Sequence, residues 1–102
     1  DVVMISSGGI TNALHIAQSI ALGASAVGMA GPILKVVINE GVNAAVNFIE
    51  RLKEQLCFIM TALGTETIRE LQQTPIVITG QTREWCDMRM IDIRSLATRS
   101  KQ

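Results

Sequence analysis

Short apolar runs alternate with helical patterns over the first 40 residues of the chain. One apolar run, Val2–Ser6, precedes a serine and two glycines, and a second, Ala24–Gly31, itself ends in glycine. Runs of this kind are typical of strands buried on both faces of a parallel sheet. Apolar residues recur at helical spacing in Asn12–Leu22 and in Ile33–Ile38. The order strand, helix, strand, helix predicts an α/β fold with a βαβα unit and parallel strands.

A longer helix is predicted after Gly41. Its apolar residues alternate spacings of three and four along the chain: Val42, Ala45, Ile49, Leu52, Leu56, Ile59 and Leu63. This spacing places them in one stripe, which we expect to pack against a sheet or another helix. A coiled coil is the alternative interpretation, but coiled coils need a longer sustained repeat.

Shorter elements are predicted beyond Gly64. Thr65 fits the N-cap of a helix Glu66–Gln72 with an acidic first turn, and Pro75 ends this pattern. The apolar run Ile76–Thr79 then predicts a short strand, since three of its four residues are β-branched and apolar.

The last predicted helix is Arg83–Ile91, in which Trp85 is expected to anchor a small core or an interface. Residues after Leu96 show no pattern, so we expect them to fray. The sequence thus predicts two parts: residues 1–64, with two βα units and the long helix, and residues 65–102, a helical tail.

Composition narrows the classes of partner. The chain carries nine basic and nine acidic residues, and aromatic residues make up 3% of it. Proteins that bind nucleic acids or anionic membranes carry a surplus of basic residues, and base stacking needs aromatic rings. We therefore expect neither a nucleic acid nor a membrane as a partner. No apolar run reaches the roughly 18 residues of a membrane span. The apolar fraction of 48% is high for a small domain, which predicts apolar surface for a partner and a homo-oligomer.

The two cysteines do not form a metal-binding pattern. Cys57 and Cys86 lie far apart in the sequence, and neither belongs to a CxxC motif. Free thiols in a reducing compartment are the better interpretation, and no signal peptide is visible at the start of the chain. We therefore expect a cytoplasmic location.

Two turns with small residues follow the two predicted strands. Gly8 and Gly9 lie in the first turn, and Ala30 and Gly31 lie in the second. The carboxyl ends of parallel strands meet at one rim, so these turns should converge. Bare N–H groups at a helix start can bind an anion such as phosphate. A purely steric role for the glycines is equally compatible with the sequence.

Other polar side chains offer no catalytic constellation. His15, the single histidine, falls on the polar side of its helix and is expected to be solvated. Ser6 and Ser7 lack histidine and carboxylate partners in the pattern, which argues against a nucleophile. We therefore assign no catalytic residue and no metal ligand within this chain.

The segments ISSGGI, IALGASAVGMAGPIL, IMTALG and REW together resemble the C-terminal part of type 2 isopentenyl diphosphate isomerases. The similarity runs from about residue 2 to about residue 95. The resemblance implies the C-terminal portion of a TIM (β/α)₈ barrel, comprising its last two βα units and a helical tail. A complete barrel needs about 250 residues, so the chain is expected to be a fragment that is inactive when isolated.

The resemblance also implies a set of cofactor-binding residues. The two turns match those that hold the FMN phosphate in this family, with Gly8, Gly9, Ile10 and Thr11 in the first and Ala30 and Gly31 in the second. Thr11 stands where the family often carries an arginine.

The implied activity is the interconversion of isopentenyl and dimethylallyl diphosphate, with reduced FMN as the acid–base group. The resemblance implies Mg²⁺ and NADPH for the parent enzyme, with their ligands and the substrate-binding residues outside this chain. Two alternatives remain: a fragment of another FMN barrel oxidoreductase, such as an α-hydroxy-acid oxidase or a glutamate synthase relative, and a non-catalytic oligomerisation segment.

Overall fold

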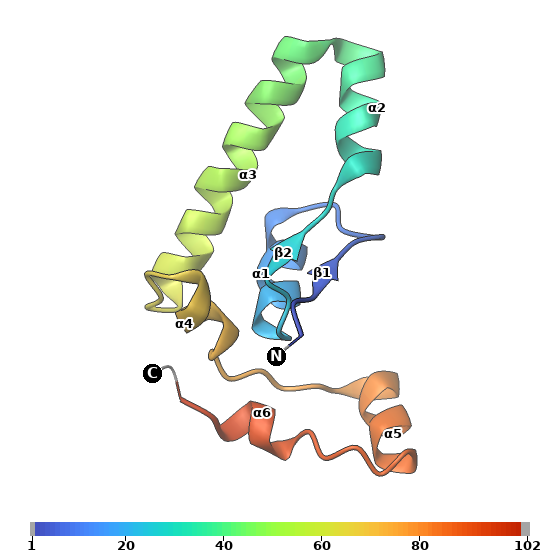
Figure 1. Ribbon diagram of the computed structural model, residues 1–102, viewed down its shortest axis with the longest axis vertical. Coiled ribbons are helices and arrows are strands. Elements are labelled where there is room, and N and C mark those ends of the chain that lie inside the picture. The colour runs from blue at the N-terminus through green and yellow to red at the C-terminus, as the bar shows by residue number, and fades with distance from the viewer. Residues whose placement is uncertain (1, 101–102) are drawn as a thin grey trace.

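The computed structural model describes residues 2–100 of the chain. Figure 1 shows a small sheet backed by α1, a projecting pair of long helices, and a tail at the other end of the molecule. The elements in chain order are β1 (Ile5–Ser6), α1 (Ala13–Ala21), β2 (Ala26–Val27), α2 (Ala30–Glu40), α3 (Val42–Ala62), α4 (Ile68–Gln72), α5 (Gly80–Met88) and α6 (Arg94–Thr98). Within residues 2–100, no helix combines the length and hydropathy needed to cross a bilayer.

The predicted βαβα order and parallel pairing are confirmed. β1 and β2 pair in parallel, with Ile5 opposite Ala26 and Ser6 opposite Val27. Both strands are shorter than the apolar runs that predicted them, because each has only one neighbour with which to form a ladder. The outer edge and much of the apolar side-chain surface of β1 remain exposed. The sheet is therefore a pair of strands with open edges.

Local signals define the ends of α1. The side chain of Asn12 accepts a hydrogen bond from the backbone N–H of His15 at 2.9 Å, which satisfies one of the free donors of the first turn. Gly23 follows the last turn with a φ of +118°, the left-handed conformation that favours glycine after a helix. The sequence thus encodes both ends of this helix.

The predicted long helix is confirmed as α3, and its stripe is only partly covered. Gly41, with a φ of +93°, separates α3 from α2, and the two helices pack side by side (Figure 1). Ala45 and Leu52 are buried, whereas Val42 at the start of the stripe is exposed. The carboxyl half of α3 packs against α1 and α4, where Leu71 is completely buried in the core.

This packing predicts unequal effects for two neighbouring residues of α3. Leu52 is 8% exposed, so Leu52→Ala should lower the free energy of unfolding by about 2–5 kcal/mol. The side chain of Lys53 is 69% exposed, so Lys53→Ala should change the free energy of unfolding by no more than about 0.5 kcal/mol. Chemical denaturation of both variants measures the difference. Equal losses would contradict the orientation of the helix.

The N-cap of α4 differs from the prediction. Thr67 caps the helix, which begins at Ile68, and its hydroxyl accepts a hydrogen bond from the N–H of Glu70 at 3.1 Å. The carboxylate of Glu70 in turn accepts from the N–H of Glu66 at 3.3 Å. Thr65 is instead buried and donates to the carbonyl oxygen of Met60. Because Thr65 is buried, the N-cap of α4 lies two residues further along the chain than predicted.

The predicted strand Ile76–Thr79 is wrong. The segment is extended but forms no strand, and its link to the tail is a hydrogen bond from the N–H of Ile76 to the carbonyl oxygen of Leu96 at 2.9 Å. A β-branched run needs a partner strand, and none lies beside it in the described part of the chain. The next helix, α5, begins at Gly80 rather than Arg83 and ends at Met88.

The tail is more ordered than the sequence predicted. Residues 97–100 do not simply fray, because α6 continues to Thr98 and Arg99 ties the end of this helix to the rest of the molecule. The last two residues of the chain lie outside the described residues. The Arg99 guanidinium donates to the carbonyl oxygen of Thr74 at 2.7 and 2.9 Å, and to that of Ala21. Trp85 is exposed and anchors no core, so only the interface alternative of that prediction stays open, and the Arg89 guanidinium lies 5.4 Å from its ring centroid.

Candidate functional site

The segments that follow the two strands lie next to one another. The N–H of Gly28 donates to the carbonyl oxygen of Ser6 at 2.8 Å, which continues the pairing with β1 one residue past the end of β2. A Cβ at Gly28 would lie 3.4 Å from the Cβ of Ser7. The structure therefore brings the starts of the two predicted turns together.

Open space surrounds the glycines of both turns. Gly8 and Gly9 have φ values of +82° and +72°, the left-handed region that side chains disfavour. A Cβ added at Gly8, Gly9 or Gly31 would meet no atom within 4 Å. The backbone of both turns is thus accessible to a group that approaches closely.

Gly31 has no conformational or steric need to be glycine. Its φ is not positive, so the backbone there does not require glycine. It is the second residue of α2, at a position where alanine is better suited to a helix by about 1 kcal/mol. Neither backbone conformation nor crowding therefore explains this glycine.

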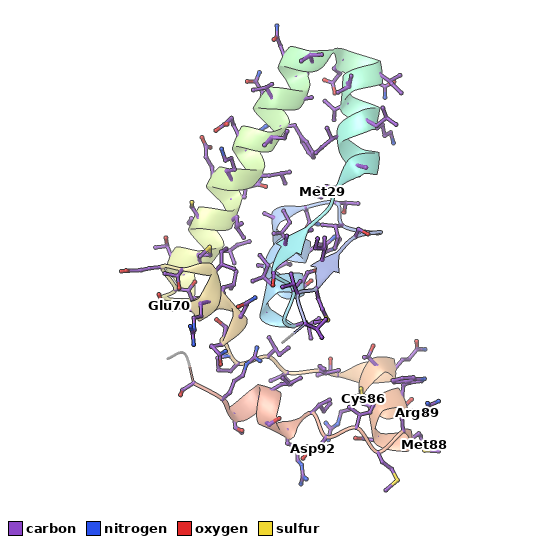
Figure 2. The ribbon with its side chains drawn as sticks, in the orientation of Figure 1. Met29, Glu70, Cys86, Met88, Arg89 and Asp92 are labelled. Carbon is purple, nitrogen blue, oxygen red and sulfur yellow. The ribbon has the colours of Figure 1, made fainter. Side chains whose placement is uncertain are left out.

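The start of α2 is the more open of the two helix N-termini. α1 is capped by the Asn12 side chain, but no side chain caps α2. Its N-cap, Met29, lies in the middle of the molecule where the chain leaves the sheet for α2, and the labelled tail residues are well separated from it (Figure 2). The N–H groups of Ala30 and Gly31 and the helix dipole together favour an anion at this end.

His15 lies in the first turn of α1, as the helical pattern predicted, and its imidazole contacts Thr11. Its Nδ1 accepts a hydrogen bond from the N–H of Thr11 at 3.2 Å and lies 3.3 Å from the Thr11 hydroxyl. The imidazole is half-buried. The four-residue spacing from Thr11 to His15 is the signal that could have revealed this pair, since residues four apart share a helix face. Ile10, also half-buried, offers the turn only its backbone.

A cavity lies away from these turns. It measures about 600 Å³ and opens between the extended segment after α4 and the helices of the tail, with Val77, Ile78, Ile91 and Ile93 among its apolar lining. At its edge the Arg94 guanidinium donates to the Asp92 carboxylate at 3.1 Å, which lowers the pKa of that exposed carboxyl group. Because its ionic groups pair with one another, the cavity offers no free charge to a ligand.

The described residues contain no cluster of histidine, cysteine or acidic side chains that could hold a metal ion. Both cysteines are free, as predicted, with Cys86 buried and Cys57 exposed. The polar groups at the two turns are backbone N–H groups, the Thr11 hydroxyl and the His15 imidazole, whose Nδ1 accepts a hydrogen bond from the N–H of Thr11.

Several curated proteins match most of this chain. It is 50% identical over 97 residues to the isopentenyl-diphosphate delta-isomerase of Geobacillus sp. (strain WCH70), a match that covers 95% of this chain and 28% of the relative. The enzyme of the same name from Bacillus licheniformis is 51% identical over 87% of this chain and 26% of the relative. That from Bacillus pumilus is 41% identical over the whole chain and 29% of the relative. These matches confirm the resemblance that the sequence motifs indicated.

The chain spans between about a quarter and a third of the length of these relatives. The family model of FMN-dependent dehydrogenases matches residues 1–78, which include both strands, the glycine turns and helices α1 to α4. This match covers most of the chain and both turns of the candidate site. The chain belongs to the FMN-dependent dehydrogenase family.

Proposed function

We propose that this chain supplies the phosphate-binding end of the FMN site in an isopentenyl-diphosphate delta-isomerase. The observation that carries the proposal is the pair of adjacent turns with open backbone, above all at Gly31, where glycine has no conformational reason. The phosphate would be held by two sets of residues: Gly8, Gly9, Ile10 and Thr11 in the first turn, and Ala30 and Gly31 in the second.

The donor set of the two turns fits a phosphate monoester. Residues 7–14 and 28–34 include no carboxylate that would repel an anion. The uncapped start of α2 supplies N–H groups together with the positive end of the helix dipole. In this arrangement FMN, once bound, supplies the acid–base chemistry, and this chain's residues hold and orient its phosphate.

The remainder of the site belongs to other parts of the parent protein. Two βα units with open strand edges are what the end of a TIM barrel would contribute, and eight such units close a barrel of about 250 residues. In this proposal residues 1–64 hold the βα units and residues 65–102 form the tail, whose first helix packs against α1. Mg²⁺, NADPH and the isoprenyl diphosphates would bind to residues outside this chain, in a cytoplasmic homo-oligomer.

The names of the relatives favour isomerisation over the chemistry of another FMN-dependent oxidoreductase. A non-catalytic assembly segment would need no bare backbone at Gly31. A flavin absorbance spectrum of the purified parent protein distinguishes an FMN enzyme from a non-catalytic assembly protein, because the assembly protein would be colourless.

Gly31→Val in the full-length enzyme tests the phosphate site. The new side chain meets no protein atom at its Cβ and needs no strained φ, so the fold should be unaffected. Loss of even one hydrogen bond to a charged group is worth roughly 1.5–3 kcal/mol, so the affinity for FMN should fall at least about tenfold. Equilibrium dialysis measures the dissociation constants of FMN and of riboflavin, which lacks the phosphate.

Asn39→Val is the matched control, because it places the same side chain at an exposed position near the other end of α2. Asn39→Val should leave the affinities for FMN and for riboflavin unchanged. Gly31→Val should leave the affinity for riboflavin nearly unchanged. If folded Gly31→Val binds FMN as tightly as the wild type, the second turn does not hold the phosphate.

A further inference from the structure

The segment Ile76–Thr79 leaves one edge of its backbone without hydrogen-bond partners. It runs from α4 to α5 as an extended stretch, and Thr79 has the extended dihedral angles φ −129° and ψ 172° (Figure 1). The N–H of Ile76 donates to the carbonyl oxygen of Leu96 in α6. Successive N–H groups of an extended chain point to opposite sides, so those of Val77 and Thr79 point away from Leu96. Neither forms a hydrogen bond within residues 2–100.

The side chains of this segment alternate in burial as those of an edge strand do. Ile76 and Ile78 are half-buried, whereas Val77 and Thr79 are exposed. All four residues are β-branched, the class that strands favour. The segment is not a strand within residues 2–100, because no strand lies beside it there. Its backbone and its side chains are therefore both suited to a partner strand.

Little in the sequence protects this edge from pairing. Exposed edge strands are commonly blunted by lysine, by proline or by bulges. Pro75 has no N–H and so limits the edge at its start. None of residues 72–82, however, has a charged side chain. Because the edge offers no charge to a charged side chain, the partner that it fits is an uncharged strand.

The size of the edge selects the source of that strand. Stable interfaces between separate proteins contain about 20–30 residues a side, whereas this edge consists of the four residues 76–79. A second copy that paired only here would dissociate. A strand of the same polypeptide pairs at an effective concentration in the millimolar range, so it needs far less contact. The chain spans between about a quarter and a third of the length of its relatives, which leaves most of such a polypeptide to supply the strand.

We propose that Ile76–Thr79 is the docking edge for an uncharged strand of the parent protein outside residues 1–102, which is added by main-chain hydrogen bonds at Val77 and Thr79. This pairing would anchor the tail of the chain to the rest of the parent protein. The inference rests on the part of the proposed function that makes this chain a piece of a longer enzyme, and it does not depend on the phosphate site.

Hydrogen exchange of the full-length enzyme, read at single backbone amides by mass spectrometry, tests the edge. The amides of Val77 and Thr79 should exchange at least about tenfold more slowly than that of Ile78, because only the first two would donate to the partner strand. General burial of the segment would instead slow all three amides. Equal rates at the three amides would overturn the inference.

Val77→Pro removes one donor of the edge without breaking any hydrogen bond within residues 2–100. In the full-length enzyme it should raise the exchange rate of the Thr79 amide at least about fivefold, the equivalent of one lost hydrogen bond. The exposed side chain of Val77 contributes little, so Val77→Ala, which keeps the N–H, should leave this rate close to that of the wild type.

Gln81→Pro is the matched control for the proline. It places the same residue at an exposed position in the first turn of α5, where the N–H has no partner within the helix. It should leave the exchange rate of the Thr79 amide unchanged. If Val77→Pro and Gln81→Pro give the same rate, no strand pairs with this edge.

The occupant is tested by diluting the wild-type enzyme. Slow exchange at Val77 and Thr79 should persist at every concentration, because the partner strand belongs to the same polypeptide. Protection that disappears on dilution would assign the edge to a second copy and would contradict the inference. The FMN affinity of Gly31→Val tests the phosphate site separately, so either proposal can fail while the other stands.

Discussion

The isolated 102-residue chain should self-associate or aggregate at micromolar concentration rather than persist as a monomer. Ile5 is 70% exposed on an edge strand, and open edges with apolar side chains are templates for pairing with another chain. The radius of gyration is 15.6 Å, compared with about 13 Å for a compact domain of 100 residues. Light scattering of the purified chain measures its mass.

Ile5→Lys tests whether the strand edge causes this association. A lysine on an edge strand opposes pairing, so this variant should associate less than the wild-type chain. A wild-type monomer that unfolds cooperatively would show that the chain has a complete core. The proposal that it forms part of a barrel would then have to be abandoned.

Leu71→Ala should lower the free energy of unfolding of the full-length enzyme by about 2–5 kcal/mol. Leu71 is 0% exposed and packs at the centre of the core with Ala17 and Ile20. Removing its side chain leaves a cavity that three helices enclose. Ile68→Ala on the same helix, where the side chain is 42% exposed, is the control and should cost much less. Chemical denaturation compares the two, and equal losses would contradict this core.

The features predicted correctly from sequence are those that local signals encode. The helical period and Gly41 defined α3, and Asn12 with Gly23 defined both ends of α1. The two apolar runs were enough to predict a pair of parallel strands, and this pairing brings the starts of the two turns, Ser7 and Gly28, together.

Features that depend on distant parts of the chain escaped prediction. Thr65 and Thr67 are both plausible caps in sequence, and only the burial of Thr65 against Met60 selects the second. The end of α6 is held by hydrogen bonds from Arg99, one of them to a carbonyl group 78 residues earlier, which no local pattern reveals. The hydrogen bond between the N–H of Thr11 and Nδ1 of His15 was not predicted, because the pattern does not show which hydrogen bonds a polar face makes.

A crystal structure of the full-length enzyme with bound FMN tests the phosphate site most directly. The phosphate oxygens should lie about 2.7–3.2 Å from the backbone nitrogens of Gly9 and Gly31, the range of an N–H···O hydrogen bond. A phosphate bound elsewhere, with these two N–H groups facing water, would contradict the proposed function of this chain.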